Sequence, residues 1–237
     1  MRKTALWAVV AVAAAATFAA AARAHDLEHA SLVTGAFGAA SYETFGFYQL
    51  ELQRSYKVGF YFDAAFMRND DFVTHVVALD YAAINAQDIF YRKYGEMAVD
   101  YNAEVFFTRG PLRPAVRPVL GARFATGDRG VSQGELGLLG GVRFVPSPTK
   151  CSFADFFVGW LGRYGSLPYE WAAEYWGWKS YFALRNANTI EIVPPLCIYV
   201  TAALDYGLYD ISPPDPEAER ERPKAVFRGG FGPAFSF

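Results

Sequence analysis

The sequence predicts an all-β fold, an antiparallel up-and-down transmembrane β-barrel of about eight to ten strands. Three observations predict it: an N-terminal segment patterned as a secretory signal peptide, many segments in which apolar and polar residues alternate, and a last segment that ends on Phe237. Successive side chains of a strand point to opposite faces, so a strand between lipid and a polar lumen alternates with a period of two.

The N-terminal segment has the three parts of a signal peptide. It begins MRK, continues with an Ala-rich apolar run over residues 5–22, and ends with small residues around Ala24. We therefore expect residues 1–24 to be cleaved, residues 25–44 to form an N-terminal segment on the periplasmic side, and residues 45–237 to form the barrel domain. A membrane-spanning anchor is the alternative interpretation of the apolar run.

Charge excludes one class of partner. The chain has a formal net charge of −2 and no basic stripe, so binding to nucleic acid is not expected. No apolar stretch after the signal is long enough for a spanning helix. An exported, aromatic-rich chain of this kind is either a membrane barrel or a soluble periplasmic β-protein.

Alternation places the expected strands. It is clear over 57–67, 96–107, 115–125, 134–144, 153–164, 196–209 and 225–237, and weaker over 48–53, 72–81 and 170–184. In the last segment, for example, Phe227 and Phe231 fall on one face, and Arg228 and Ser236 on the other. The stretch 82–94 is the one place where a helical pattern competes.

The connections give an orientation. Bacterial barrels have short periplasmic turns and longer outer loops. Short connections are expected at 68–70, 108–114 and 146–150, which would be periplasmic. Long outward loops are expected at 82–95 and 210–224. A long connection at 185–195 departs from this trend.

Taken together, the signal peptide, the evenly spaced alternating segments and the terminal Phe resemble Gram-negative outer-membrane β-barrels, and the size is similar to small barrels of the OmpA, OmpX or OmpW kind. The resemblance implies an outer-membrane location, lipid as a partner, and an assembly signal made by Phe231, Phe235 and Phe237 for the barrel-assembly machinery. The alternative is the edge strand of a soluble sandwich that ends on Phe.

Charged residues on the predicted inner faces form a candidate site. Its members are Glu96, Asp100, Glu104, Arg117, Arg123, Arg143, Asp155, Arg163 and Arg228. Neighbouring strands of an up-and-down barrel lie side by side, so the acids of 96–107 and the arginines of 115–125 can pair. The lumen of a barrel this narrow is filled by side chains. A polar core and an ion-selective constriction are the two interpretations.

Other chemistry-bearing residues are few. Cys151 and Cys197 are candidates for a disulfide, because an exported protein meets an oxidising periplasm. His25 and His29 would lie near the mature N-terminus and are only a weak copper or zinc candidate, so no metal or cofactor is expected. His75 is the candidate general base of an enzyme, but no G-x-S-x-G motif accompanies it, and it falls on an apolar face.

The sequence therefore favours a small outer-membrane barrel without enzymatic activity. Its role would be structural, or docking of an envelope protein or polysaccharide, or a narrow porin-like passage for small solutes. An outer-membrane lipid-modifying enzyme is the alternative, and a soluble periplasmic β-sandwich binding protein is a further one. The aromatic patch around Trp160, Trp171, Trp176 and Trp178 fits either an interfacial girdle or a docking surface.

Overall fold

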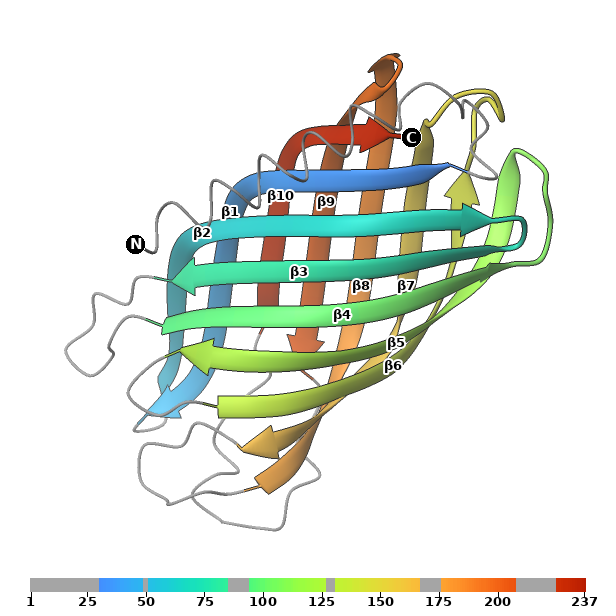
Figure 1. Ribbon diagram of the computed structural model, residues 1–237. Helices are drawn as coiled ribbons and strands as arrows, with labels where there is room; N and C mark the ends of the chain where they lie inside the picture. Colours follow the sequence, from blue (N-terminus) through green and yellow to red (C-terminus); the bar gives the residue numbers. More distant parts are fainter. Residues whose placement is uncertain (1–29, 49–50, 85–93, 127–130, 167–175, 208–224) are drawn as a thin grey trace, which may run out of the picture.

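The chain folds into a closed antiparallel barrel of ten strands in the part that the structure describes. A computed structural model describes residues 30–48, 51–84, 94–126, 131–166, 176–207 and 225–237. The strands are β1 (Ser31–Tyr48), β2 (Glu51–Asp70), β3 (Val73–Ile84), β4 (Tyr94–Phe106), β5 (Leu112–Thr126), β6 (Val131–Phe144), β7 (Phe153–Ser166), β8 (Trp176–Val193), β9 (Leu196–Gly207) and β10 (Ala225–Ser236). Each pairs with its neighbours in the chain, and β1 pairs with β10 (Figure 1). The predicted fold class is confirmed.

The two ends of the chain close the barrel. Leu32 of β1 lies opposite Ser236 of β10. Ser31 and Phe237 exchange two backbone hydrogen bonds of 2.9 Å, one in each direction. The terminal residue thus belongs to the seam, and the sheet has no free edge there.

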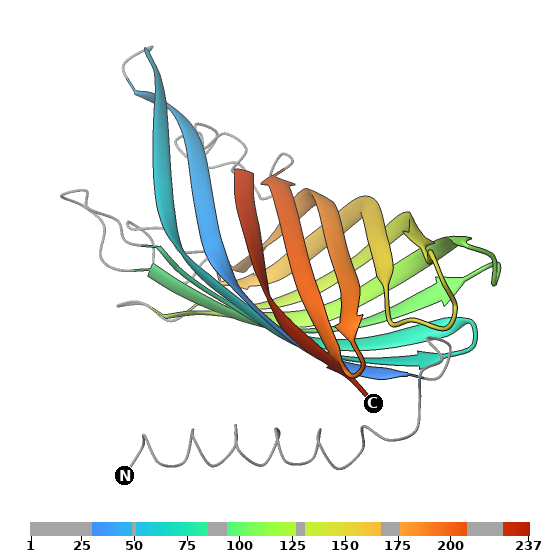
Figure 2. The same ribbon diagram turned by 90° about the horizontal axis from the view of Figure 1, so that it is seen from above.

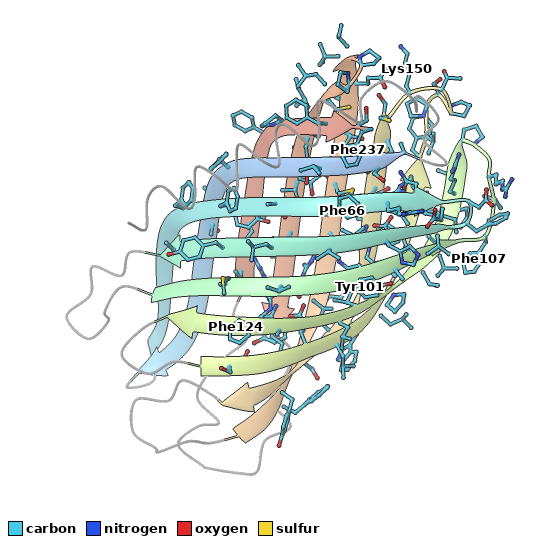
Figure 3. All side chains as sticks on the ribbon, viewed as in Figure 1. Phe66, Tyr101, Phe107, Phe124, Lys150 and Phe237 are labelled. Carbon is cyan, nitrogen blue, oxygen red and sulfur yellow. The ribbon has the colours of Figure 1, made fainter. Side chains whose placement is uncertain are left out.

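Side chains alternate between lumen and exterior as the pattern predicts. On β5, Arg117 and Arg123 are buried, whereas Leu120 and Phe124 are 65% and 40% exposed. Large apolar residues on the outside of the other strands are exposed in the same way, Phe66 and Tyr101 among them (Figure 3). An apolar exterior around a polar lumen is the arrangement of a transmembrane barrel.

Connection lengths separate the two ends of the barrel. The turns at 71–72, 107–111, 145–152 and 194–195 lie at the end that carries Ser31 and Phe237, and we call it the short-turn end. The opposite end, the loop end, joins strands through the remaining connections, which lie outside the described residues. There the β1–β2 hairpin extends beyond its neighbours (Figure 2). No helix among the described residues is long and apolar enough to cross a membrane.

The barrel begins earlier than the sequence predicted. Residues 31–44 belong to β1, although they were expected to precede the barrel, and the expected strand 48–53 spans the tip between β1 and β2. The inner face of β1 carries Leu32, Ala36 and Ala40 and its outer face carries Val33 and Phe37. Because both faces are apolar or small, the strand lacks the contrast that alternation needs.

The expected long connection at 185–195 is also wrong. β8 continues to Val193 and is followed by Pro194-Pro195 alone. Arg185 pairs in register with Phe157 of β7, and Thr189 with Phe153. At 68–70 the expected turn is the end of β2, and the chain reverses at Asp71, whose φ of 45° permits a tight turn. Residues 1–29, including the expected signal peptide, the loop 210–224 and most of 82–94 lie outside the described residues.

Candidate functional site

The lumen holds a network of paired charges. Its ion pairs join six arginines to six carboxylates in the described part of the barrel: Arg117, Arg123, Arg143, Arg163, Arg185 and Arg228 with Asp80, Asp100, Glu104, Glu135, Asp155 and Asp205. All twelve lie on inward positions of their strands. The network divides into two clusters, one toward each end of the barrel.

The cluster toward the short-turn end is centred on Arg143. Its Nε and Nη2 donate to the two carboxylate oxygens of Asp155, each over 2.7 Å. Nη2 also donates to Glu104 over 2.5 Å, and Nη1 donates to Thr74 Oγ1 over 2.9 Å. Rings of Phe106 and Phe153 lie within 5 Å of the guanidinium carbon. We call Arg143, Glu104, Asp155 and Arg117 the Arg143 cluster.

Arg117 completes this cluster. It donates to Glu104, lies 3.6 Å from Asp155 Oδ2, and places its guanidinium carbon 3.9 Å from the ring centre of Phe157. Gly141 leaves room for that ring, since a Cβ added at this glycine would lie 2.6 Å from Phe157 Cδ1. The guanidinium of Arg117 and the ring of Phe157, for which Gly141 leaves space, therefore pack together at this end of the lumen.

The cluster toward the loop end is centred on Asp205, which is fully buried. Its carboxylate accepts from Arg163 over 2.6 Å and from Arg228, and it lies 2.5 Å from Arg185 Nη2. Arg163 also donates to Glu135 over 2.5 Å. We call Asp205, Arg163, Arg185, Arg228 and Glu135 the Asp205 cluster. Arg123 extends it by donating to Glu135 over 2.7 Å.

Several of these pairs cross the lumen. Arg143 on β6 reaches Thr74 on β3, and β4 and β5 lie between those strands. Arg228 on β10 lies 3.7 Å from Asp80 on β3, with β1 and β2 between. Such contacts join strands that are three apart around the ten-strand barrel, so paired side chains extend into the lumen at both levels.

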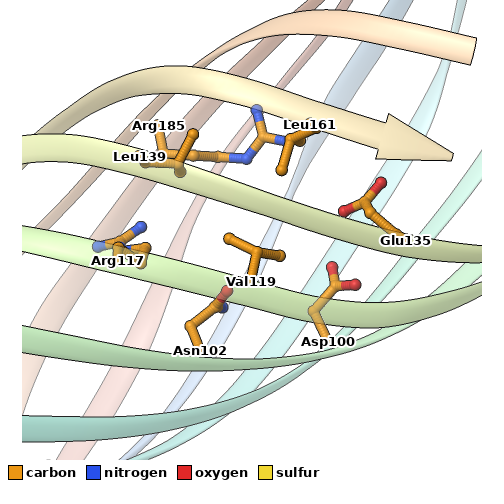
Figure 4. Close-up of a pocket in the computed structure, with 8 residues that line it drawn as sticks. All are labelled: Asp100, Asn102, Arg117, Val119, Glu135, Leu139, Leu161 and Arg185. Carbon is orange, nitrogen blue, oxygen red and sulfur yellow. The ribbon is translucent and has the colours of Figure 1, made fainter.

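A small cavity lies between the clusters. Its volume is about 40 Å³, and its wall includes Asp100, Asn102, Arg117, Glu135 and Arg185, together with three apolar side chains (Figure 4). We call it the central chamber. Charged groups of both signs line it.

The structure places the sequence-predicted charges as follows. Arg117 and Glu104 pair across β5 and β4, as do Arg123 and Asp100, although the second pair is 3.9 Å apart. Arg143, Asp155, Arg163 and Arg228 lie in the two clusters. The side chain of Glu96 lies outside the described part of the structure.

Sequence reasoning missed five groups of the lumen: Asp63, Asp80, Glu135, Arg185 and Asp205. Inward parity on β2, β3, β6 and β9 was a signal for four of them, whereas Arg185 fell in a segment predicted to be a loop. Asp63 lies opposite Asp80 in register, and its Oδ1 has no hydrogen-bond partner among the described residues.

No disulfide joins Cys151 and Cys197 in this structure, and both are fully buried. Both belong to one apolar cluster at the short-turn end, where Cys197 Sγ lies 4.0 Å from the carbonyl oxygen of Cys151. The disulfide expected from the sequence is therefore not formed here, and bridging stays a prediction.

The structure describes one of the three histidines, His75. His75 lies on the exterior face of β3, and its Nδ1 is 2.8 Å from the hydroxyl of Tyr101 on β4. His25 and His29 lie outside the described residues. No group of three or more His, Cys, Asp or Glu among the described residues is arranged to hold a metal.

The aromatic residues singled out in the sequence lie mostly on the exterior. Trp160 and Trp178 stack with ring centres 5.8 Å apart, and Tyr164 lies beside Trp178 toward the loop end. Trp171 is outside the described residues, and the side chain of Trp176 is not described. In the terminal segment, Phe231 is 70% exposed, Phe235 is half-buried, and Phe237 lies against Phe66.

Comparison with known proteins adds structural neighbours only. No protein-family model matches the sequence, and no curated protein matches it either. Among solved structures, the chain is similar to Neisserial surface protein A at 7% identity and a TM-score of 0.35, covering 88% of this chain and 97% of that one.

Two further neighbours have comparable scores. The translocator domain of the autotransporter NalP from Neisseria meningitidis has 10% identity and a TM-score of 0.38, covering 100% and 98% of the two chains. Ail, the attachment invasion locus protein of Yersinia pestis, has 13% identity and a TM-score of 0.31, covering 88% and 99%. We therefore base the proposals below on the lumen and exterior of this chain itself.

Proposed function

We propose that this protein is an outer-membrane β-barrel of a Gram-negative bacterium whose lumen is closed, and that it serves a structural or docking role instead of transport or catalysis. The single observation that carries the proposal is the pairing of buried charges between strands at two levels of the lumen. A passage for ions or sugars needs a continuous wet path, and the two clusters place paired side chains in that path.

The exterior supports the membrane location. Outward residues on neighbouring strands are large and apolar, for example Leu136 and Leu138 on β6, which are 46% and 57% exposed. A soluble protein rarely exposes a contiguous apolar band of this kind. Strands of 12 residues or more are also longer than the roughly 9–11 residues that a tilted transmembrane strand needs.

Fractionation tests location and fold together. The chain is expressed with its N-terminal segment, and outer membranes are run unboiled and boiled on a gel. A closed barrel in the outer membrane predicts a detergent-resistant form that migrates faster before boiling. Recovery as a soluble periplasmic protein would contradict the proposal and favour a β-sandwich.

The same experiment tests the terminal assembly signal that we propose for Phe231, Phe235 and Phe237. Phe237→Ala leaves the backbone bonds to Ser31 in place but removes the terminal ring, so we expect less protein in the outer membrane. Phe227→Ala changes an exposed ring of the same strand outside the signal and is the matched control. Equal outer-membrane levels for both variants would remove this role.

A lumen that is closed predicts a second result. Proteoliposomes that contain the folded barrel should not swell in small sugars faster than protein-free vesicles. Faster swelling would favour the narrow passage instead. The enzyme alternative predicts a lipid-modification activity that disappears in His75→Ala, and we expect no such activity.

In the docking role, an envelope protein or a polysaccharide would contact the loop end. Loss of a specific envelope phenotype on exchanging the loop 208–224 for a short Gly-Ser linker, with the barrel still heat-modifiable, would support docking there. An unchanged phenotype would leave the structural role.

A further inference from the structure

The central chamber has the composition of a binding site, because two buried polar atoms on its wall lack protein partners. Asp100 is 8% exposed and Arg117 is also 8% exposed. Among the described residues, Asp100 Oδ1 and Arg117 Nε have no hydrogen-bond partner. A buried polar group without a partner is costly, so such atoms indicate a missing occupant.

The two atoms need opposite hydrogen-bond partners. A carboxylate oxygen accepts hydrogen bonds, and Arg117 Nε–H donates one. Arg123 Nη2 lies 3.9 Å from Asp100 Oδ2, beyond hydrogen-bond distance, and Arg123 already donates twice to Glu135. The occupant must therefore donate to Asp100 and accept from Arg117.

Charge on the wall excludes ions of either sign. Arg117 and Arg185 face the chamber with Asp100 and Glu135, two positive charges against two negative ones. A cation would relieve Asp100 but would lie against both arginines, and an anion would do the reverse. A neutral molecule that both donates and accepts hydrogen bonds can contact groups of both signs on the wall.

Volume limits the size of that molecule. About 40 Å³ is space for roughly three water molecules, taking ~10–15 Å³ for each. Val119, Leu139 and Leu161 close the apolar side of the chamber. No sugar or hydrated ion fits a space of this size.

We propose that the central chamber is a binding site for small neutral hydrogen-bonding molecules, occupied by water that bridges Asp100 Oδ1 and Arg117 Nε. The site rests on the lumen groups alone and goes beyond the closed-barrel role. It makes the centre of the barrel a place that holds water and rejects both cations and anions.

The test is crystallographic and uses three probes: water, bromide and rubidium. Crystals of the folded wild-type barrel are soaked in rubidium bromide, and anomalous maps locate the ions. We expect water density within hydrogen-bond distance of Asp100 and Arg117, and no ion peak in the chamber. A chamber without density, or one that holds bromide or rubidium, would overturn the proposal.

Two near-isosteric variants extend the test. Asp100→Asn leaves two arginines against Glu135, so the chamber should gain a bromide peak. Asn102→Asp adds a carboxylate to the balanced wall, so it should gain a rubidium peak and no bromide. The same ion, or no ion, in both variants would show that wall charge does not select the occupant. Should a variant fail to fold, the wild-type soaks still decide.

Discussion

The two charge clusters close one lumen with inverted arrangements. At the short-turn end one arginine, Arg143, holds two carboxylates, and its side chain and theirs are at most 3% exposed. At the loop end one carboxylate, Asp205, holds three arginines, and the edge of that group is wetter, with Arg185 19% exposed.

The neighbours of the clusters differ as well. Aromatic rings lie beside the guanidinium of Arg143, and Thr74 accepts from its remaining nitrogen. In the Asp205 cluster one ring, that of Tyr181, lies beside the guanidinium of Arg163. Two of the three arginines have a second carboxylate, Glu135 for Arg163 and Asp80 for Arg228. The Arg143 cluster is therefore packed around one cation, and we call it the plug. The Asp205 cluster is a network with alternative partners, and we call it the web.

The largest expected effect follows from breaking the plug. Arg143→Met removes the cation between Glu104 and Asp155 and leaves Arg117 alone to pair with both buried carboxylates. We expect a loss of about 3–5 kcal/mol in the free energy of unfolding, because two buried negative charges then share one cation. Urea unfolding of the barrel in lipid vesicles measures it.

A surface pair provides the control for that variant. Arg68 pairs with Asp70 at 3.3 Å, but the side chains are 63% and 49% exposed. Arg68→Met should cost less than about 1 kcal/mol. Comparable losses for Arg143→Met and Arg68→Met would contradict the description of the plug.

Breaking the web should cost less. In Asp205→Asn, Arg163 keeps Glu135 and Arg228 keeps Asp80. Arg185 loses its carboxylate but is 19% exposed and still donates to two backbone carbonyls. The loss is therefore that of hydrogen bonds to a charged group, about 2 kcal/mol. The loss should shrink at high salt, since screening reaches the exposed edge at Arg185. A loss larger than that of Arg143→Met, without salt dependence, would reverse the comparison.

Packing of the plug can be tested without changing charge. Gly141→Ala places a Cβ against Phe157 and the backbone of Phe156, and overpacking of this kind costs about 1–3 kcal/mol. Gly140→Ala is the matched control, because a Cβ there meets nothing within 4 Å. Gly141→Ala should unfold at a lower urea concentration than Gly140→Ala. Equal stability of the two variants would show that the packing around Phe157 can adjust to the added methyl group.

The smallest expected effect concerns the two thiols beside the plug. A periplasmic thiol–disulfide oxidoreductase would take two electrons and two protons from Cys151 and Cys197 and leave one disulfide. Protein isolated from the outer membrane should then resist alkylation after unfolding unless a reductant is added. Alkylation of both thiols without reductant would show that they stay unbridged, as in this structure.

The sequence predicts most of the barrel because lipid and lumen impose opposite polarity on the two faces of a strand. Where that contrast is present, as at Leu120 and Arg123 on β5, parity is correct residue by residue. Where the contrast is missing, the strand boundaries were predicted wrongly. The start of β1 was missed because its residues are small and apolar on both faces. The end of β8 was missed because Asn186 and Asn188 interrupt its apolar face.

The candidate site is predictable only in part for a related reason. Adjacent strands make pairs such as Arg117 with Glu104 foreseeable from parity and order. The lumen-crossing contacts, Arg143 with Thr74 and Arg228 with Asp80, depend on barrel diameter and register, which no local pattern encodes. The Asp205 cluster includes Arg185, which was not among the predicted lumen residues because residues 185–195 were expected to be a loop.

Single-channel recording tests the central claim, a lumen closed at two levels, most directly. Heat-modifiable wild-type barrel is inserted into a planar lipid bilayer under voltage, with Arg143→Met measured beside it. A lumen closed at two levels predicts no discrete current steps for the wild type, and none for Arg143→Met, because the Asp205 cluster still closes the loop end. Stable, stepwise currents through the wild-type barrel would contradict a closed lumen.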